Sequence, residues 1–182
     1  MTQLWKIGVP ALLLTAMVAG CGGSSSDGPG GGTAGGIPTS FSFKEAFEKL
    51  EASGQLPVLD RSDSITGIDA NANGVRDDMD RYIDSKPDTQ PQKNSLKSLH
   101  RAFNRAMTVD TKDRNALRDV ANSINLSVIC IHQTYPSEKA SPAGREIEKL
   151  TVNTRGRYDA YMKFNSAMNG TVMSDVKGVK CD

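Results

Sequence analysis

Residues 110–136, DTKDRNALRDVANSINLSVICIHQTYP, carry the clearest helical period in the chain. Apolar residues recur there at steps of three and four, at Leu117, Val120, Ala121, Ile124, Val128 and Ile131. This spacing puts them on one face of a helix, while the opposite face stays in water. Asp110 is a suitable N-terminal cap, and Pro136 cannot continue the helix. The stretch therefore predicts a long amphipathic helix that packs against other helices.

The preceding hundred residues contain more helical spacing, separated by loops. Residues 92–107 have an apolar side made of Leu96, Leu99, Phe103 and Met107. Pro87 and Pro91 mark a break before this helix. A shorter apolar period runs through Val75, Met79, Tyr82 and Ile83. Residues 55–74 have no helical period and are rich in turn formers, so they are predicted to be loop.

Two further helical segments flank these. Ser42-Phe43-Lys44-Glu45 has the pattern of a capping box, and Gly54 stops the helix that follows it. Ser141-Pro142 has the pattern of an N-cap followed by proline at the first helical position. The stripe that starts there continues toward Asn169-Gly170 and is interrupted at Gly156, so it is one helix or two. No stretch alternates as a strand would, and the predicted fold is all-α, a small helical bundle.

The N-terminus, MTQLWKIGVPALLLTAMVAGCGG, has the layout of an export signal. Lys6 supplies a positive charge, and an apolar run from Ile7 to Val18 is too short to span a bilayer comfortably. The end of the signal, Val18-Ala19-Gly20-Cys21, resembles the lipobox of bacterial lipoproteins. In that family the signal is cut before the cysteine, which becomes acylated on its thiol and on its new amine. The resemblance implies a signal peptide at 1–20 and a lipid anchor on Cys21, whereas the alternative is an ordinary secretory signal that contains a cysteine.

Residues 21–38 are dominated by glycine and serine and are predicted to be a flexible tether. About sixteen such residues have a root-mean-square reach on the order of 20–25 Å, which would hold a domain just off a membrane surface. Two or more acyl chains make such anchoring stable. Lipoproteins with aspartate after the lipidated cysteine tend to stay in the inner membrane. Gly22 stands there instead, so the resemblance favours the outer membrane of a Gram-negative envelope, facing the periplasm.

The rest of the chain, residues 39–182, has a length that suits one domain with a modest core. The whole chain has 22 basic and 21 acidic residues, and removal of Lys6 with the signal balances them. This neutrality argues against nucleic acid as a general partner. With Cys21 lipidated, Cys130 and Cys181 remain, and two cysteines in an exported chain most simply form a disulfide. The alternative is two free buried thiols.

Residues 69–80, DANANGVRDDMD, have the ligand order of a twelve-residue calcium loop. Oxygen-bearing side chains occupy positions 1, 3, 5, 9 and 12 and a backbone carbonyl serves position 7, at Asp69, Asn71, Asn73, Asp77, Asp80 and Val75. Gly74 is at position 6, where the loop turns sharply. Calcium takes hard oxygen ligands of this kind. The alternative is an Asx-rich turn that caps the helix expected near Val75.

The loop departs from the EF-hand pattern in having aspartate, not glutamate, at position 12 and Arg76 at position 8. No clear helix leads into it, and it resembles the loops of dockerins and thrombospondin type 3 repeats, which end in aspartate. The resemblance covers twelve residues and implies a metal site without a fold or an activity. With Asp69 and Asp80 as the direct charged ligands, binding is expected to be weak, around 10⁻⁴–10⁻³ M, and structural. Whether Asp60, Asp63 or Asp78 adds a contact stays open.

Other chemistry-bearing residues have ordinary interpretations. Basic residues recur every four positions at Lys93, Lys97, Arg101 and Arg105. This pattern is typical of a solvated helix face, and the alternative is a surface for anionic headgroups or an acidic partner. His100 and His132 belong to no catalytic or metal motif and are expected to be satisfied or exposed. Four residues near the C-terminus could form a binding patch, but they fall at helical spacing and are predicted to be core: Tyr158, Tyr161, Met162 and Phe164.

Three functions fit these features. The first is a non-enzymatic, lipid-anchored envelope protein with a structural calcium loop, whose surface binds another protein. The second is an immunity-type inhibitor, because lipoproteins of this size with a disulfide-bonded helical domain resemble periplasmic antidotes to secreted antibacterial toxins. The third is a cell-envelope enzyme with a cryptic site, which a deep acidic cleft would support.

Overall fold

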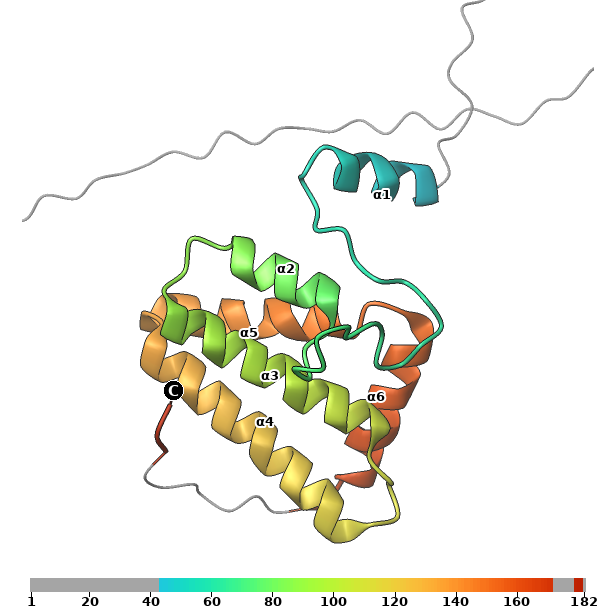
Figure 1. The fold of residues 1–182 in the computed structure, drawn as a ribbon. Coiled ribbons are helices and arrows are strands. Elements are labelled where there is room, and N and C mark those ends of the chain that lie inside the picture. Colours follow the sequence, from blue (N-terminus) through green and yellow to red (C-terminus); the bar gives the residue numbers. More distant parts are fainter. Residues whose placement is uncertain (1–42, 172–178, 182) are drawn as a thin grey trace, which may run out of the picture. The chain divides into compact units, whose positions relative to one another are not determined.

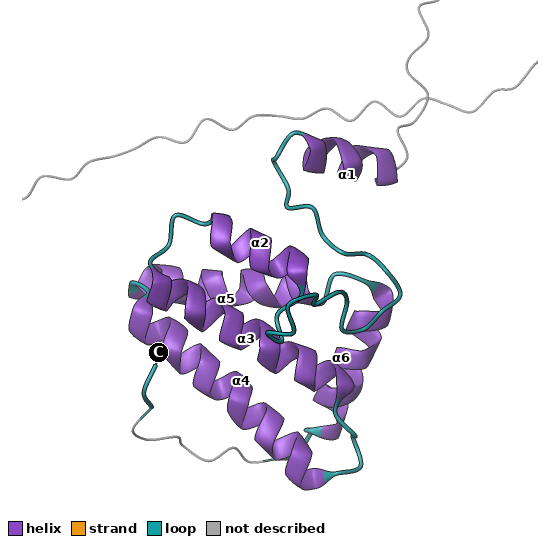
Figure 2. Cartoon of the chain, in the orientation of Figure 1, coloured by secondary structure: helices purple, strands orange, loops and turns teal. Residues whose placement is uncertain are grey.

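The helical periods of the sequence become six helices in the computed structural model, which describes residues 43–171 and 179–181. These are α1 Phe43–Ala52, α2 Asp77–Ser85, α3 Gln90–Thr108, α4 Arg114–Thr134, α5 Ser137–Thr151 and α6 Arg155–Ala167. The described residues contain no strand, as Figure 2 shows. The predicted all-α class is therefore confirmed. The signal at 1–20, the tether at 21–38 with Cys21, and the Ser42 cap lie outside the described residues.

Helix α3 is the element against which α2, α4, α5 and α6 all pack. Figure 1 shows it flanked by α2 and α4. Its first turn is closed by Thr89, whose backbone N–H donates to Gln92 Oε1 at 2.8 Å. Pro91, predicted to belong to the break before this helix, lies in its first turn instead. Proline is tolerated there because the first N–H groups of a helix have no partner within the helix.

The apolar stripes meet in two adjoining buried groups. The larger group gathers Val75, Met79, Ile83, Leu96, Leu99, Phe103, Ile131, Tyr135, Ala140, Ala143 and Ile147. The smaller group gathers Ala106, Leu117, Val120, Ala121 and Phe164. The predicted core positions on α3 and α4 are confirmed except at Val128, which is 37% exposed. On α6, Tyr158 and Met162 are 50% and 40% exposed, so their assignment to the core was wrong.

Two helices begin later than the sequence predicts, and hydrogen bonds explain both shifts. Helix α4 is capped by Asp113 and not by Asp110, because Asp113 Oδ1 accepts from the N–H groups of Asn115 and Ala116 at 2.9 and 3.0 Å. Helix α2 begins at Asp77 and not at Val75. The Val75 N–H is already used by the side chain of Asn73, which holds this residue in the loop.

The stripe predicted from Ser141 onward is two helices. Helix α5 starts at Ser137, directly after Pro136, whose carbonyl accepts from Lys139 and Ala140 at 2.8 and 3.0 Å. Pro142 therefore lies inside α5 and not at its first position, which was wrongly predicted. It is exposed, so water can reach the carbonyl left without its helical partner. The break before α6 falls at residues 152–154, just ahead of Gly156.

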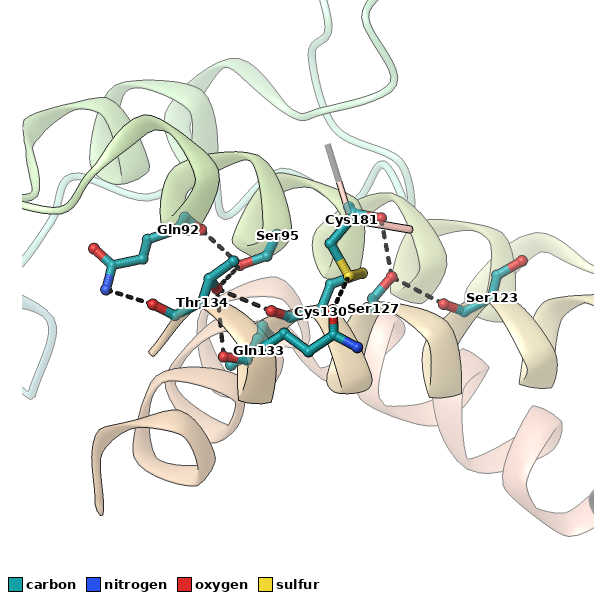
Figure 3. The surroundings of a disulfide bond; sticks show 10 residues. Gln92, Ser95, Ser123, Ser127, Cys130, Gln133, Thr134 and Cys181 are labelled. Carbon is teal, nitrogen blue, oxygen red and sulfur yellow. Dashed lines mark hydrogen bonds between the residues drawn. A yellow bond between two sulfur atoms is a disulfide. The ribbon is translucent and has the colours of Figure 1, made fainter. Parts of the chain in front are cut away.

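Cys130 and Cys181 form a disulfide with a Cα–Cα distance of 5.4 Å, as predicted. It fixes the last described residues, 179–181, beside the C-terminal half of α4 (Figure 3). The bond spans a sequence separation of 51 residues, so it removes conformations of the unfolded chain by closing a long loop. Gln133 Oε1 lies 3.2 Å from the Cys181 sulfur.

In the part of the chain that the structure describes, every helix is too short or too polar to cross a bilayer.

Candidate functional site

The loop at residues 69–80 is folded around its own acidic and amide side chains. The carboxylate of Asp69 accepts from the backbone N–H of Asn73 at 3.1 Å and from that of Gly74 at 2.8 Å. Asn71 Oδ1 accepts from the Asn73 N–H at 3.1 Å, and Asn73 Oδ1 from the Val75 N–H at 2.7 Å. Gly74 has φ +80°, the left-handed conformation that glycine adopts without strain. Positions 1, 3, 5 and 6 thus form one tight turn.

The last position of the loop closes onto this turn. Asp80 Oδ2 accepts from the amide of Asn73 at 2.6 Å and, more weakly, from that of Asn71 at 3.5 Å. Positions 3, 5 and 12 therefore come within hydrogen-bonding distance of one another. Lys97 on α3 adds an ammonium 2.9 Å from Asp80 Oδ1. Burial raises the pKa of Asp80, but the hydrogen bonds from Lys97 and Asn73 outweigh it, and the net pKa is lowered.

The two remaining predicted ligands differ in their placement. Asp77 Oδ1 accepts from the N–H of Ala70 at 3.1 Å, so its carboxylate faces the start of the loop. The Asp77 N–H donates to the Ile68 carbonyl at 2.8 Å, which joins the first residue of α2 to the residue before the loop. The Val75 side chain is fully buried in the core, and only its carbonyl is available as an oxygen ligand.

The additional acidic residues do not face the loop. Asp78 is committed to Arg76, and its Oδ2 also accepts from the N–H of Asp60 at 2.8 Å. Asp60 Oδ1 accepts from the Ser62 N–H, and its Oδ2 lies 3.4 Å from Arg157. Asp63 is exposed. Among the described residues, no three His, Cys, Asp or Glu side chains gather as a metal cluster. A calcium loop of this type depends on amide and carbonyl oxygens in addition to its carboxylates.

A buried ion pair supports the loop from inside, which the sequence interpretation missed. Arg76 is fully buried, and its guanidinium binds Asp78 through Nε–Oδ1 at 2.5 Å and Nη2–Oδ2 at 2.8 Å. It also donates to the carbonyls of Leu150 and Thr151 at 3.1 and 3.3 Å. These carbonyls belong to the last turn of α5, where helical partners are lacking. The signal was present in the sequence, since Arg76 occupies the position where calcium loops carry an aliphatic residue.

His100 completes the support. The Arg76 backbone N–H donates to His100 Nε2 at 3.1 Å, so Nε2 is unprotonated. The proton is therefore on Nδ1, which donates to Thr151 Oγ1 at 2.8 Å. Burial, with the nearby Arg76 charge, lowers the His100 pKa to about 3. His100 is a neutral structural residue, as expected from its lack of a motif.

A second buried arginine orders the segment that leads into the loop. Arg157 on α6 donates through Nη2 to the Ser64 carbonyl at 2.8 Å and through Nε to the Ile65 carbonyl at 3.1 Å. Its Nη1 donates to the Asp60 carbonyl and to Asn153 Oδ1. The irregular chain between Asp60 and Ile65 thus has partners for its carbonyls without regular secondary structure.

The basic residues of α3 are used within the molecule, not simply solvated. Lys93 donates to the Asp84 carbonyl at 2.7 Å, and Lys97 binds Asp84 as well as Asp80. Arg101 Nε donates to the Asn73 carbonyl at 3.0 Å, which fixes the loop to α3. The predicted solvated basic face is therefore present only in part: Arg101 and Arg105 are exposed, but Lys93, Lys97 and Arg101 also bond to α2 or to the loop.

Gly67 lies against the Arg76 side chain, and a substitution at Gly67 tests this contact. It has φ +71°, and an added Cβ would lie 2.1 Å from Arg76 Cδ, which cannot move without breaking its pair with Asp78. Gly54 has φ +72° and nothing within 4 Å of such a Cβ. Both alanine variants suffer the backbone strain, but Gly67→Ala also overpacks, so we expect it to lose about 2 kcal/mol more stability than Gly54→Ala. Urea denaturation of both variants measures this, and equal losses would contradict the contact.

His100 predicts a pH dependence of stability. Its ordinary pKa of 6.5 falls to about 3 on folding, so between these values the unfolded chain takes up a proton that the folded chain does not. Stability therefore falls with decreasing pH below about 6.5, by up to about 1.4 kcal/mol per pH unit. Denaturation at several pH values between about 5 and 7 measures the slope. His100→Gln should flatten it, and His132→Gln, at an exposed position, should not; an equally steep slope in His100→Gln would contradict the assignment.

Comparison with known proteins adds no relative to this picture. No family model, no curated protein and no solved structure matches the chain. The geometry of the loop and the N-terminal sequence are therefore the features that bear on function.

Proposed function

We propose that the chain is a lipid-anchored protein of a Gram-negative envelope, in which the loop at 69–80 binds a structural calcium ion and the helical domain binds another protein. The observation that carries the calcium proposal is the meeting of Asn71 and Asn73 at Asp80, beside the turn that Asp69 organises. Carboxylate, amide and carbonyl oxygens are the donors that calcium prefers. The proposed ligands are those predicted from the sequence: Asp69, Asn71, Asn73, Val75, Asp77 and Asp80.

The charges around the loop support weak binding. Asp80 already has a cationic partner in Lys97 at 2.9 Å, and a bound ion would compete with this ammonium. Only Asp69 and Asp80 supply charge directly, so we expect a Kd around 10⁻⁴–10⁻³ M. The ion would neutralise the Asp80 carboxylate, which is now contacted by the amides of Asn71 and Asn73 and by the Lys97 ammonium. Its role would be to hold the start of α2 and not to signal a change in calcium.

The anchor and the location rest on the N-terminal sequence. The lipobox at Val18–Cys21 and the glycine- and serine-rich tether at 21–38 support acylation of Cys21 and a position facing the periplasm, with the outer membrane favoured by Gly22. The balanced charge supports a protein partner and no nucleic acid.

We propose no enzymatic activity. A groove of about 680 Å³ between α3 and α4 has serines and basic residues, and no carboxylate, among its described lining residues, whereas an acidic cleft would favour the enzyme alternative. The immunity-type inhibitor remains the alternative within the same protein-binding class, and a neighbouring toxin gene would distinguish it.

The calcium site predicts a specific stabilisation. At a free calcium concentration about ten times Kd, the native state gains about 1.4 kcal/mol, which raises the melting midpoint by a few degrees. Asp69→Asn with Asp80→Asn keeps side-chain oxygens for the loop hydrogen bonds but removes both charges, so the calcium response should be lost. Thermal melts of the purified full chain in calcium, magnesium and chelator measure this.

A matched control removes two exposed carboxylates elsewhere, Asp63→Asn with Asp119→Asn, and should retain the full calcium response. A response that survives in the Asp69 and Asp80 variant, or that is equal with magnesium, would exclude this loop as the calcium site.

The anchor predicts a change of location without a change of fold. Cys21→Ala removes the acylated thiol, so the protein should move from the membrane fraction to the soluble envelope fraction with an unchanged melting midpoint. Fractionation followed by immunoblotting measures the location, with Cys130→Ser/Cys181→Ser as a control that should stay in the membrane fraction. Membrane association that persists in Cys21→Ala would refute the anchor.

A further inference from the structure

A groove lies between α3 and α4 and is bordered by the described C-terminal residues. Its volume is about 680 Å³, within the usual range for ligand pockets. Its walls include Arg101 and Arg105 from α3, Ser123 and Ser127 from α4, and Lys180 next to the disulfide. Figure 3 shows Cys181 beside Ser127 on this side of α4. The disulfide therefore keeps Lys180 at the edge of the groove.

The charge of the groove is one-sided. Arg101, Arg105 and Lys180 line it, and no aspartate or glutamate is among the described lining residues. Arg101 uses Nε for the Asn73 carbonyl, and Arg105 uses Nη1 for Ser123 Oγ at 3.1 Å. Within the described residues, their other guanidinium N–H groups and the Lys180 ammonium make no hydrogen bond or ion pair. The groove thus offers several cationic donors to an anionic ligand.

The serine hydroxyls of the groove offer hydrogen-bond acceptors, whereas its cationic side chains offer donors. Ser123 donates to the Asp119 carbonyl and Ser127 to the Ser123 carbonyl, both at 2.9 Å. Because the Ser127 proton is used in this way, Ser98 is the donor in its 3.0 Å contact with Ser127. The three hydroxyl protons are committed within the protein, so the hydroxyls present oxygen lone pairs to a ligand. A matching ligand must carry N–H donors as well as negative charge.

We propose that this groove binds an acidic peptide segment of the protein partner. Carboxylates of the segment would pair with Arg105 and Lys180, and its backbone N–H groups would donate to the hydroxyls of Ser98 and Ser123. The phosphodiester groups of lipids supply acceptors only and leave the hydroxyls unmatched. A flat membrane surface also fits a concave groove less well than one extended chain. The proposal deepens the proposed binding of a protein partner and rests on it.

The test uses the purified full chain and a synthetic peptide of three Gly-Asp-Glu repeats, blocked at both ends. Its neutral counterpart has asparagine and glutamine in place of the acids. Calorimetric titration should show saturable binding of one acidic peptide per chain, weaker at high salt, and no binding of the neutral peptide. Arg105→Gln with Lys180→Gln should weaken binding about fivefold or more, because two charge pairs are lost. Arg101 is left intact because it holds the calcium loop.

The matched control removes the same charges elsewhere, Arg118→Gln with Lys149→Gln, at exposed positions outside the groove, and should bind the acidic peptide like the unmodified chain. Equal binding of acidic and neutral peptides, unchanged binding by the Arg105 and Lys180 variant, or no binding at all would overturn the proposal. Binding of inorganic phosphate or of phosphatidylglycerol vesicles in place of the peptide would also overturn it and assign the groove to oxyanions.

A second arm separates this proposal from the proposed function. Arg105 borders a pocket beside Asp69 and Gly74, but its hydrogen bond goes to Ser123 and not to the loop at 69–80. Peptide binding should therefore persist in chelator even if the loop binds no calcium. Cross-linking in cells compares the groove variant with its control. A partner adduct that forms equally in both would overturn the groove and leave the protein-binding function standing. Absence of any adduct, together with absence of peptide binding, would overturn both.

Discussion

The buried pair between Arg76 and Asp78 is the interaction on which the rest of the domain depends. Arg76 joins the start of α2 to the last carbonyls of α5, and Asp78 joins it to the backbone of Asp60. Removal of either partner would leave an unpaired buried charge, at a cost of about 3–5 kcal/mol. The backbone N–H of Arg76 also donates to His100 and so orients its ring. Three segments distant in sequence are thus held together by one guanidinium and its neighbours.

This arrangement divides residues 69–80 into an inner and an outer half. Val75 and Arg76 point inward and are fully buried, whereas the side chains of Asn71 and Asn73 remain on the exposed side. The loop conformation is therefore set by the core and by Arg101, and a cation would meet a backbone turn that is already formed. The amide groups of Asn71 and Asn73, which now donate to Asp80, would have to turn to present their oxygens. Less ordering on binding means less loss of entropy, which compensates in part for the small number of charged ligands and for competition by Lys97.

The sequence was sufficient where a regular period or local chemistry decides the structure. The apolar stripes predicted the helices, the two cysteines predicted their disulfide, and the side chains at Asp69, Asn71 and Asn73 predicted a tight turn around Gly74. The sequence was insufficient where contacts with residues distant in the chain determine the position of a side chain. Arg76 would ordinarily be assigned to the surface, and nothing local shows that Asp78, Leu150 and His100 surround it. The use of Lys97 was missed for the same reason, since it depends on a contact between separate helices. The start of α2 was missed although its cause, the hydrogen bond from Val75 to Asn73, is local.

The most direct test of the central claim is a calcium titration followed by the backbone amide resonances of the ¹⁵N-labelled full chain. The account predicts saturable shifts at Asn73, Gly74 and Val75 with calcium but not with magnesium. It also predicts nearly unchanged resonances at Met79 and Ile83, because Arg76 and Asp78 already hold α2 in place. Absence of saturable shifts at Gly74 would contradict the metal site, and large shifts throughout α2 would contradict a loop that is organised before the ion binds.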